Sequence, residues 1–222
     1  MKFIYQTWWK VLASILILYS IIAGYLIPVP ALPLLHETIR VTFFHVPMWL
    51  AMFAVFFISV IFSIRYLYTG KEEHDLVAVE CVNTGMIFFV LGIVSGMLWA
   101  YITWGEAWSN DPKQNSAAIT FLIYCAYLVL RGSIDDEQKR AKISSVFNIF
   151  AFPIMIVLVI ILPRMTDSLH PGNGGNPAFS DMTDPNIRLV LRPAFAGWIL
   201  MAIWIASIRY RLRILDRNRL LR

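Results

Sequence analysis

Charged residues are scarce in this chain. Only 15% of its 222 residues are Asp, Glu, Lys or Arg, whereas 59% are hydrophobic and the mean hydropathy is +0.65. A soluble domain of this length normally carries more charge, about 25%. The hydrophobic residues also form long uninterrupted runs, which indicate a membrane protein.

Cysteine is nearly absent, and several motifs are missing. Cys81 and Cys125 are the two cysteines, each inside an apolar run, and the sequence has neither a CxxC pair nor a CxxCH haem-attachment site. This argues against a thiol oxidoreductase and against a c-type cytochrome. The GxxxxGK[ST] phosphate-binding loop and the HExxH motif are also absent, so ATP binding by that route is not expected.

Six apolar segments are long enough to cross a bilayer, which takes about 20 residues of helix. We expect transmembrane helices at residues 8–28, 43–67, 79–101, 115–131, 143–163 and 189–208. The predicted fold class is therefore all-α, an integral membrane bundle of six helices that forms a single domain over residues 1–222. The first segment is long and has no clear cleavage site, so it is expected to be an uncleaved anchor rather than a signal peptide.

The distribution of Lys and Arg predicts the orientation. Most of the 19 basic residues lie at the N-terminus, in the 2–3 and 4–5 connections and in a basic tail at about 209–222. The positive-inside rule then places both termini in the cytoplasm and the 1–2, 3–4 and 5–6 connections outside. The tail is suited to an anionic lipid bilayer, and no nucleic-acid motif accompanies it, so no nucleic-acid partner is expected.

Histidines gather on the predicted outer side. His36, His45 and His170 lie there, whereas His74 is cytoplasmic. His170 belongs to the long 5–6 connection, which is rich in Gly, Pro and Asn, and long structured loops are often functional. An ordinary loop histidine is the alternative interpretation.

His45 lies at the expected start of the second helix, in FHVPMW. Pro47 is suited to a first helical turn, and Trp49 shares a helical face with His45. The positive potential of a helix N-terminus favours a neutral imidazole, which is the form that binds a metal. A solvated interfacial histidine is the alternative.

The 3–4 connection carries an aromatic run, WAYITWGEAWSNDP, at residues 99–112. If this run is helical, Trp104, Trp108 and Asp111 share one face, and Gly105 permits close approach of a neighbour or ligand. An interfacial aromatic belt explains one or two tryptophans, but explains three within ten residues less well.

The end of this run predicts the start of the fourth helix. Asp111, Pro112 and Gln114 have the spacing of an acidic capping box. Two outward imidazoles and an aromatic shelf together suggest a planar metal complex, and haem fits. Its propionates require cations, for which the outward arginines and lysine are available: Arg188, Arg192, Arg164 and Lys113.

Three stretches resemble one known family. WGEAWSNDP at 104–112 is similar to the pattern WGxxWxWDP, HVPMW at 45–49 to an outward histidine that opens the second helix, and LHPG at 169–172 to a histidine in the 5–6 connection. These are marks of the CcmC-type haem-handling proteins of cytochrome c maturation, the six-helix branch of a Trp-rich (WWD-motif) family that includes CcsA. Asn110 departs from the pattern, which has Trp at this position.

The resemblance implies a function and a site. Such a protein holds haem b on the periplasmic face of the bacterial inner membrane and presents it to a CcmE-type haem chaperone, beside a CcmAB-type ABC transporter and a small one-helix membrane subunit. His45 and His170 would be the axial iron ligands and Trp99, Trp104 and Trp108 the shelf. The whole expected cofactor-binding set is His45, His170, Trp49, Trp99, Trp104, Gly105, Trp108, Asp111, Pro112, Arg188 and Arg192.

Other functions stay open at this point. A haem lyase acting directly on apocytochrome c is the alternative within the family, although such proteins are usually longer. A cofactor-free transporter subunit would need polar or broken helices near the midplane, and few are present. A b-type di-haem cytochrome would need paired histidines within helices. A haem-delivery protein, rather than a classical enzyme, is the preferred interpretation.

Overall fold

The structure, a computed structural model, describes residues 2–30, 35–170 and 184–220, and these residues form helices and connections without strands. Among the described residues, six helices are long and apolar enough to cross a membrane, which confirms the predicted all-α multi-pass bundle. They are α1 Trp8–Leu26, α2 Thr42–Thr69, α3 Glu72–Trp104, α4 Pro112–Gly132, α5 Glu137–Ile156 and α6 Pro185–Leu220. Short helical pieces are Lys2–Tyr5, His36–Val41, the π-helical Val157–Ile161 and Leu162–Arg164.

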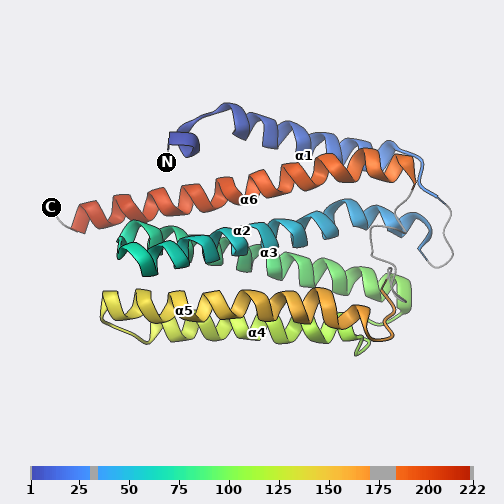
Figure 1. Cartoon of the computed structure of the whole chain (residues 1–222). Helices are drawn as coiled ribbons and strands as arrows, with labels where there is room; N and C mark the ends of the chain where they lie inside the picture. Colours follow the sequence, from blue (N-terminus) through green and yellow to red (C-terminus); the bar gives the residue numbers. More distant parts are fainter. Residues whose placement is uncertain (1, 31–34, 171–183, 221–222) are drawn as a thin grey trace.

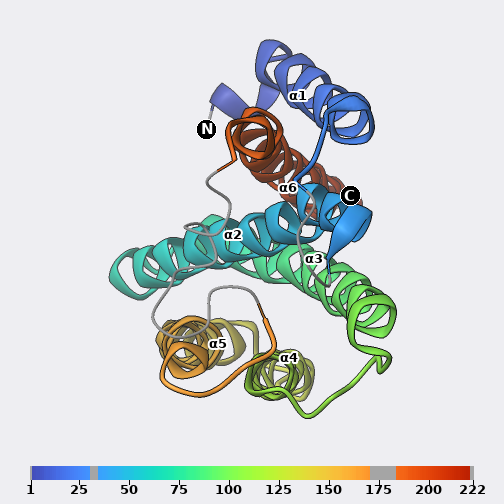
Figure 2. The ribbon, with the colours of Figure 1, turned by 90° about the vertical axis from the view of Figure 1, so that its right-hand side faces the viewer.

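The helices lie in layers (Figures 1 and 2). Antiparallel α2 and α3 form the central layer, with α6 and then α1 on one side and α4 and α5 on the other. Both chain ends lie at one end of the bundle, and the described parts of the 1–2, 3–4 and 5–6 connections lie at the opposite end (Figure 1). We call these the terminus end and the connection end. The placement of the connection end outside the cell remains a prediction.

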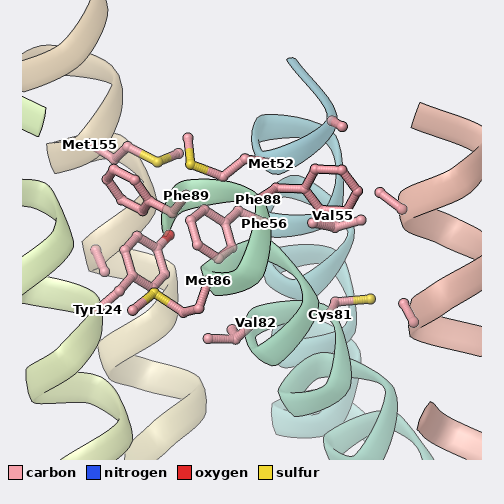
Figure 3. Close-up of a cluster of buried hydrophobic side chains, with 14 of the residues drawn as sticks. Met52, Val55, Phe56, Cys81, Val82, Met86, Phe88, Phe89, Tyr124 and Met155 are labelled. Atoms are coloured by element: carbon pink, nitrogen blue, oxygen red, sulfur yellow. The ribbon is translucent and has the colours of Figure 1, made fainter. Parts of the chain in front are cut away.

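The main core extends from α4 and α5 through the central layer to α6 (Figure 3). Phe56 of α2 stacks on Tyr124 of α4 with ring centroids 4.0 Å apart. The Phe56 ring also packs against α3 at Gly85, where an added Cβ would lie 2.2 Å from that ring. This glycine therefore lets α2 and α3 approach closely.

Two helices, α3 and α6, extend well beyond their predicted bounds. The first turn of α3 begins at Glu72 rather than at residue 79, and α6 continues to Leu220 instead of ending at residue 208. The acidic first turn of α3 suits the positive end of the helix dipole. Glu72 also forms an ion pair with Arg217 of the α6 extension, so charged partners stabilise both additions.

Ion pairs hold the terminus end together. Glu80 of α3 is only 2% exposed and accepts hydrogen bonds from Arg209 at 2.9 Å and from Arg213 at 2.9 and 3.0 Å. Asp75 forms a two-pronged pair with Arg131 of α4, at 2.8 and 2.5 Å. Buried carboxylates need such partners because an isolated buried charge is very costly.

Candidate functional site

Glycines of α3 create the space in which His45 lies. A Cβ at Gly96 would lie 2.8 Å from Cε1 of His45, and one at Gly92 would lie 3.0 Å from the Trp49 indole. The pairs His45–Gly96 and Trp49–Gly92 lie in the same antiparallel register of α2 and α3 as Phe56 and Gly85 in the core. The ring of His45 therefore packs directly on the α3 backbone, and its Nδ1 lies 3.0 Å from a side-chain oxygen of that helix, Ser95 Oγ.

His170 is held by a carboxylate from another connection. Its Nδ1 lies 2.8 Å from Asp111 Oδ1. The Asp111 carboxylate, 4% exposed as a residue, also accepts from Ser168 Oγ at 2.8 Å and from the Leu169 N–H at 2.7 Å. It further accepts from the Lys113 N–H at 2.8 Å, as N-cap of α4. One side chain thus starts α4 and anchors the 5–6 connection.

The protonation of Asp111 follows from these contacts. Burial alone would raise the pKa of this carboxyl, but hydrogen bonds from His170, Leu169 and Ser168 and the nearby imidazole outweigh burial and leave the pKa well below its usual range. An ionised carboxylate only accepts hydrogen bonds. When the ring is neutral, Nδ1 of His170 is therefore the protonated nitrogen, and Nε2 then carries the lone pair that a metal needs.

Two tryptophans of α3 flank the histidines. Trp104, the last residue of α3, meets His170 edge-on with centroids 4.9 Å apart. Trp99 meets His45 edge-on at 5.9 Å, and its indole N–H donates to Thr38 Oγ1 at 3.2 Å. That hydrogen bond connects α3 to the helical turn at 36–41.

Both histidines line one pocket at the connection end. Its lining residues are Leu35, His45, Gly96, Trp99, Ala100, Thr103, Trp104 and His170. Its cavity volume is about 30 Å³, which is room for one or two water molecules. The described part of the chain has no cluster of three or more His, Cys, Asp or Glu that would hold a bare metal ion. Two imidazoles alone suit an iron whose other ligands come from a macrocycle.

Comparison with known proteins identifies a family for the chain. The family model described as "CcmC: Heme exporter protein C" matches residues 2–221. The chain belongs to the CcmC family. This membership places it among the haem-handling membrane proteins of cytochrome c biogenesis.

The individual relatives share only modest sequence identity with this chain. "Heme exporter protein C" of Paracoccus denitrificans is 23% identical over 82% of this chain and 75% of its own length. "Cytochrome c biogenesis protein CcsA" of two Prochlorococcus marinus strains is 35% and 41% identical, over 43% and 46% of this chain. The match spans only 30% and 32% of those CcsA proteins, so it covers a shared segment of them.

The aromatic run is not one continuous helix, and this corrects the predicted common face. Gly105, with φ of 83°, ends α3 in the left-handed conformation, and its N–H donates to the Tyr101 carbonyl. Residues 105–111 then form a non-helical connection. Trp108 is 37% exposed and is not among the pocket-lining residues, and its indole N–H donates to Asn115 Oδ1 at 3.2 Å.

Other local predictions are partly confirmed. Asp111 and Pro112 cap α4 as expected, but Gln114 reaches back to the Ser109 N–H at 2.9 Å rather than to the Asp111 N–H. No described atom lies within 4 Å of a Cβ built on Gly105, so this glycine ends a helix and does not admit a close neighbour. Pro47 lies in the second turn of α2, because that helix begins at Thr42.

The remaining candidates are not among the described residues that line the pocket. Arg188 and Arg192 are exposed on the first turns of α6 and are not among the pocket-lining residues, so their role toward propionates stays a prediction. His36 opens the turn at 36–41. The Gly-rich part of the 5–6 connection, 171–183, lies outside the described residues. The signal that the sequence prediction missed was the glycine spacing on α3, which matches the spacing of His45 and Trp49 on α2.

Proposed function

We propose that this chain binds haem b at the connection end, with Nε2 of His45 and Nε2 of His170 as the axial iron ligands. The observation that carries the proposal is the meeting of these two imidazoles, from segments far apart in sequence, in one pocket. Each ring has its Nδ1 engaged by a fixed partner, which leaves Nε2 for a metal. Family membership supplies the class of ligand.

The small cavity bears on how haem is held. A volume of about 30 Å³ does not enclose a macrocycle, so haem would lie with one edge outside the bundle, against Trp99 and Trp104. Accommodating it requires the 5–6 connection around His170 to separate from the end of α3. A shallow, edge-out site is suited to delivery, because the exposed edge is open to a partner.

The partners and the membrane face belong to the same proposal. The connection end faces the periplasm of a bacterium, across the inner membrane from the basic terminus end. There the chain presents haem to a membrane-anchored chaperone of the CcmE type. It works beside ABC transporter subunits of the CcmAB type and a small one-helix subunit. Co-purification of tagged protein with such a chaperone tests the partner.

Haem content tests the ligands. Wild type, His45→Ala and His170→Ala would be purified in detergent and compared by haem stain and visible absorption. His74→Ala is the matched control, because His74 lies at the terminus end and bonds Thr69 there. We expect low-spin haem in wild type and control, and loss of haem or of the low-spin spectrum in both site variants. Unchanged low-spin spectra in both would refute the assignment.

Cysteine labelling tests on which side of the membrane the connection end lies. After removal of Cys81 and Cys125, Ser109→Cys in the 3–4 connection and Ser133→Cys in the 4–5 connection would be treated with a membrane-impermeant maleimide. We expect labelling of the first in intact spheroplasts and of the second only after permeabilisation. The reverse pattern would overturn the orientation.

A further inference from the structure

The contact between His45 and Ser95 determines which nitrogen of His45 carries the proton. Ser95 Oγ donates its single proton to the Gly92 carbonyl, at 3.1 Å. Toward His45 Nδ1, 3.0 Å away, the same oxygen can then only accept. Nδ1 of His45 is therefore protonated, and Nε2 carries the lone pair.

Packing prevents the ring from leaving this arrangement. One face lies against Gly96, where even a methyl group would clash with Cε1 at 2.8 Å. Trp99 and Trp49 flank the ring edge-on, with centroids 5.9 and 6.2 Å from His45. A flipped imidazole would direct carbon rather than nitrogen at Ser95 and lose its hydrogen bond.

The two histidines differ in the partner of Nδ1. His170 donates to the Asp111 carboxylate, whereas His45 donates to a neutral hydroxyl. A carboxylate partner makes an imidazole a stronger electron donor to a metal, because the charge-assisted hydrogen bond shifts the proton away from the ring. A hydroxyl partner strengthens the imidazole as an electron donor much less.

We propose that Ser95 is a positioning residue for haem: it fixes His45 in the Nδ1–H tautomer and makes His45 the weaker of the two iron ligands. The second half of this inference rests on the proposed haem site. The first half concerns the chain alone and can be tested without haem.

The haem-free test is ¹⁵N NMR of histidine-labelled protein in detergent, with the His45 signals assigned by their loss in His45→Gln. We expect the Nδ1–H tautomer in wild type and a mixture of tautomers in Ser95→Ala. Ser20→Ala is the matched control, because it removes a buried serine hydroxyl that bonds its own helix backbone in α1. An Nε2–H tautomer in wild type, or no change in Ser95→Ala, would overturn the tautomer assignment.

The haem-loaded test is the midpoint potential of Ser95→Ala and Ser95→Asp. A carboxylate at this position should strengthen His45 and lower the potential, while alanine should raise it; a merely structural role would not move the two in opposite directions. Midpoint potentials that shift in the same direction in both variants, or that do not shift, would contradict the proposal that His45 is the weaker of the two iron ligands. If wild type binds no haem, the proposed function fails, and the NMR result still decides the tautomer.

Discussion

Glu80 at the terminus end and Asp111 at the connection end are both buried carboxylates, 2% and 4% exposed, yet they are satisfied in different ways. Glu80 is neutralised by two arginines of α6, which are permanent cations. Asp111 accepts from backbone and hydroxyl donors and from an imidazole whose second nitrogen stays available. The comparison teaches that one carboxylate only holds helices together, whereas the other also orients a candidate ligand.

The largest effect is expected from Asp111→Ala. This change removes an N-cap and leaves three further donors without their acceptor, so the free energy of unfolding should fall by about 4 kcal/mol, at about 1 kcal/mol for each contact. Haem retention should fall with it. Thermal unfolding in detergent, followed by tryptophan fluorescence, measures the first effect. Asp111→Asn is the matched control because it retains a good N-cap acceptor. Equal stability of wild type and Asp111→Ala would contradict the structure.

Glu80→Gln should destabilise the terminus end without affecting the haem site at the connection end. We expect a loss of about 2 kcal/mol, below the roughly 3–5 kcal/mol of a fully buried ion pair, because Arg209 and Arg213 are partly exposed. The haem spectrum should stay unchanged. Glu73→Gln, at an exposed position of the same helix, is the control and should cost little. A haem spectrum altered by Glu80→Gln would show that the two ends are coupled.

The contribution of Asp111 to stability should fall at acidic pH. Because the folded state depresses the pKa of this carboxyl, its stabilisation is present above its ordinary pKa of 3.8 and is lost as the pH falls toward the folded value. The stability difference between wild type and Asp111→Asn should therefore shrink by about 1–2 kcal/mol below about pH 4. Unfolding measured from pH 7 to pH 3 checks this, and a difference that does not vary with pH would speak against an ionised, hydrogen-bonded Asp111.

The smallest effect concerns Asn110, which replaces the Trp of the WGxxWxWDP pattern that this segment resembles. Asn110 has φ of 54°, a left-handed conformation that Asn tolerates better than most residues. Restoring the pattern with Asn110→Trp should cost about 1 kcal/mol in this backbone, and Asn110→Gly should be nearly neutral. Thermal unfolding compares the two, and a stabilised Asn110→Trp would indicate a different local backbone.

Much of this architecture could be predicted from local sequence signals. Six apolar runs give six helices because a bilayer demands about 20 apolar residues for each crossing. Asp111 and Pro112 predict the start of α4 since capping depends on neighbours in sequence. The shared face of His45 and Trp49 also follows from helical spacing, and both rings do pack on α3.

Long-range contacts could not be predicted in this way. Nothing near Asp111 in sequence reveals that residues 168–170 donate to it, because that meeting depends on how α4 and α5 pack. The sequence predicts that the basic segment at about 209–222 is a tail beyond the last helix, yet Glu72 and Glu80 of α3 pair with its arginines in the α6 extension. The left-handed Gly105 broke the expected common face of Trp104 and Trp108, since one glycine can end a helix or lie within it.

Electron paramagnetic resonance of the ferric, haem-loaded protein tests the central proposal most directly, because it reports the axial ligands of the iron. We predict a low-spin signal typical of two imidazoles in wild type and in His74→Ala, and its loss in both His45→Ala and His170→Ala. A high-spin signal in wild type, or a low-spin signal that survives in both site variants, would contradict the assignment of these two histidines.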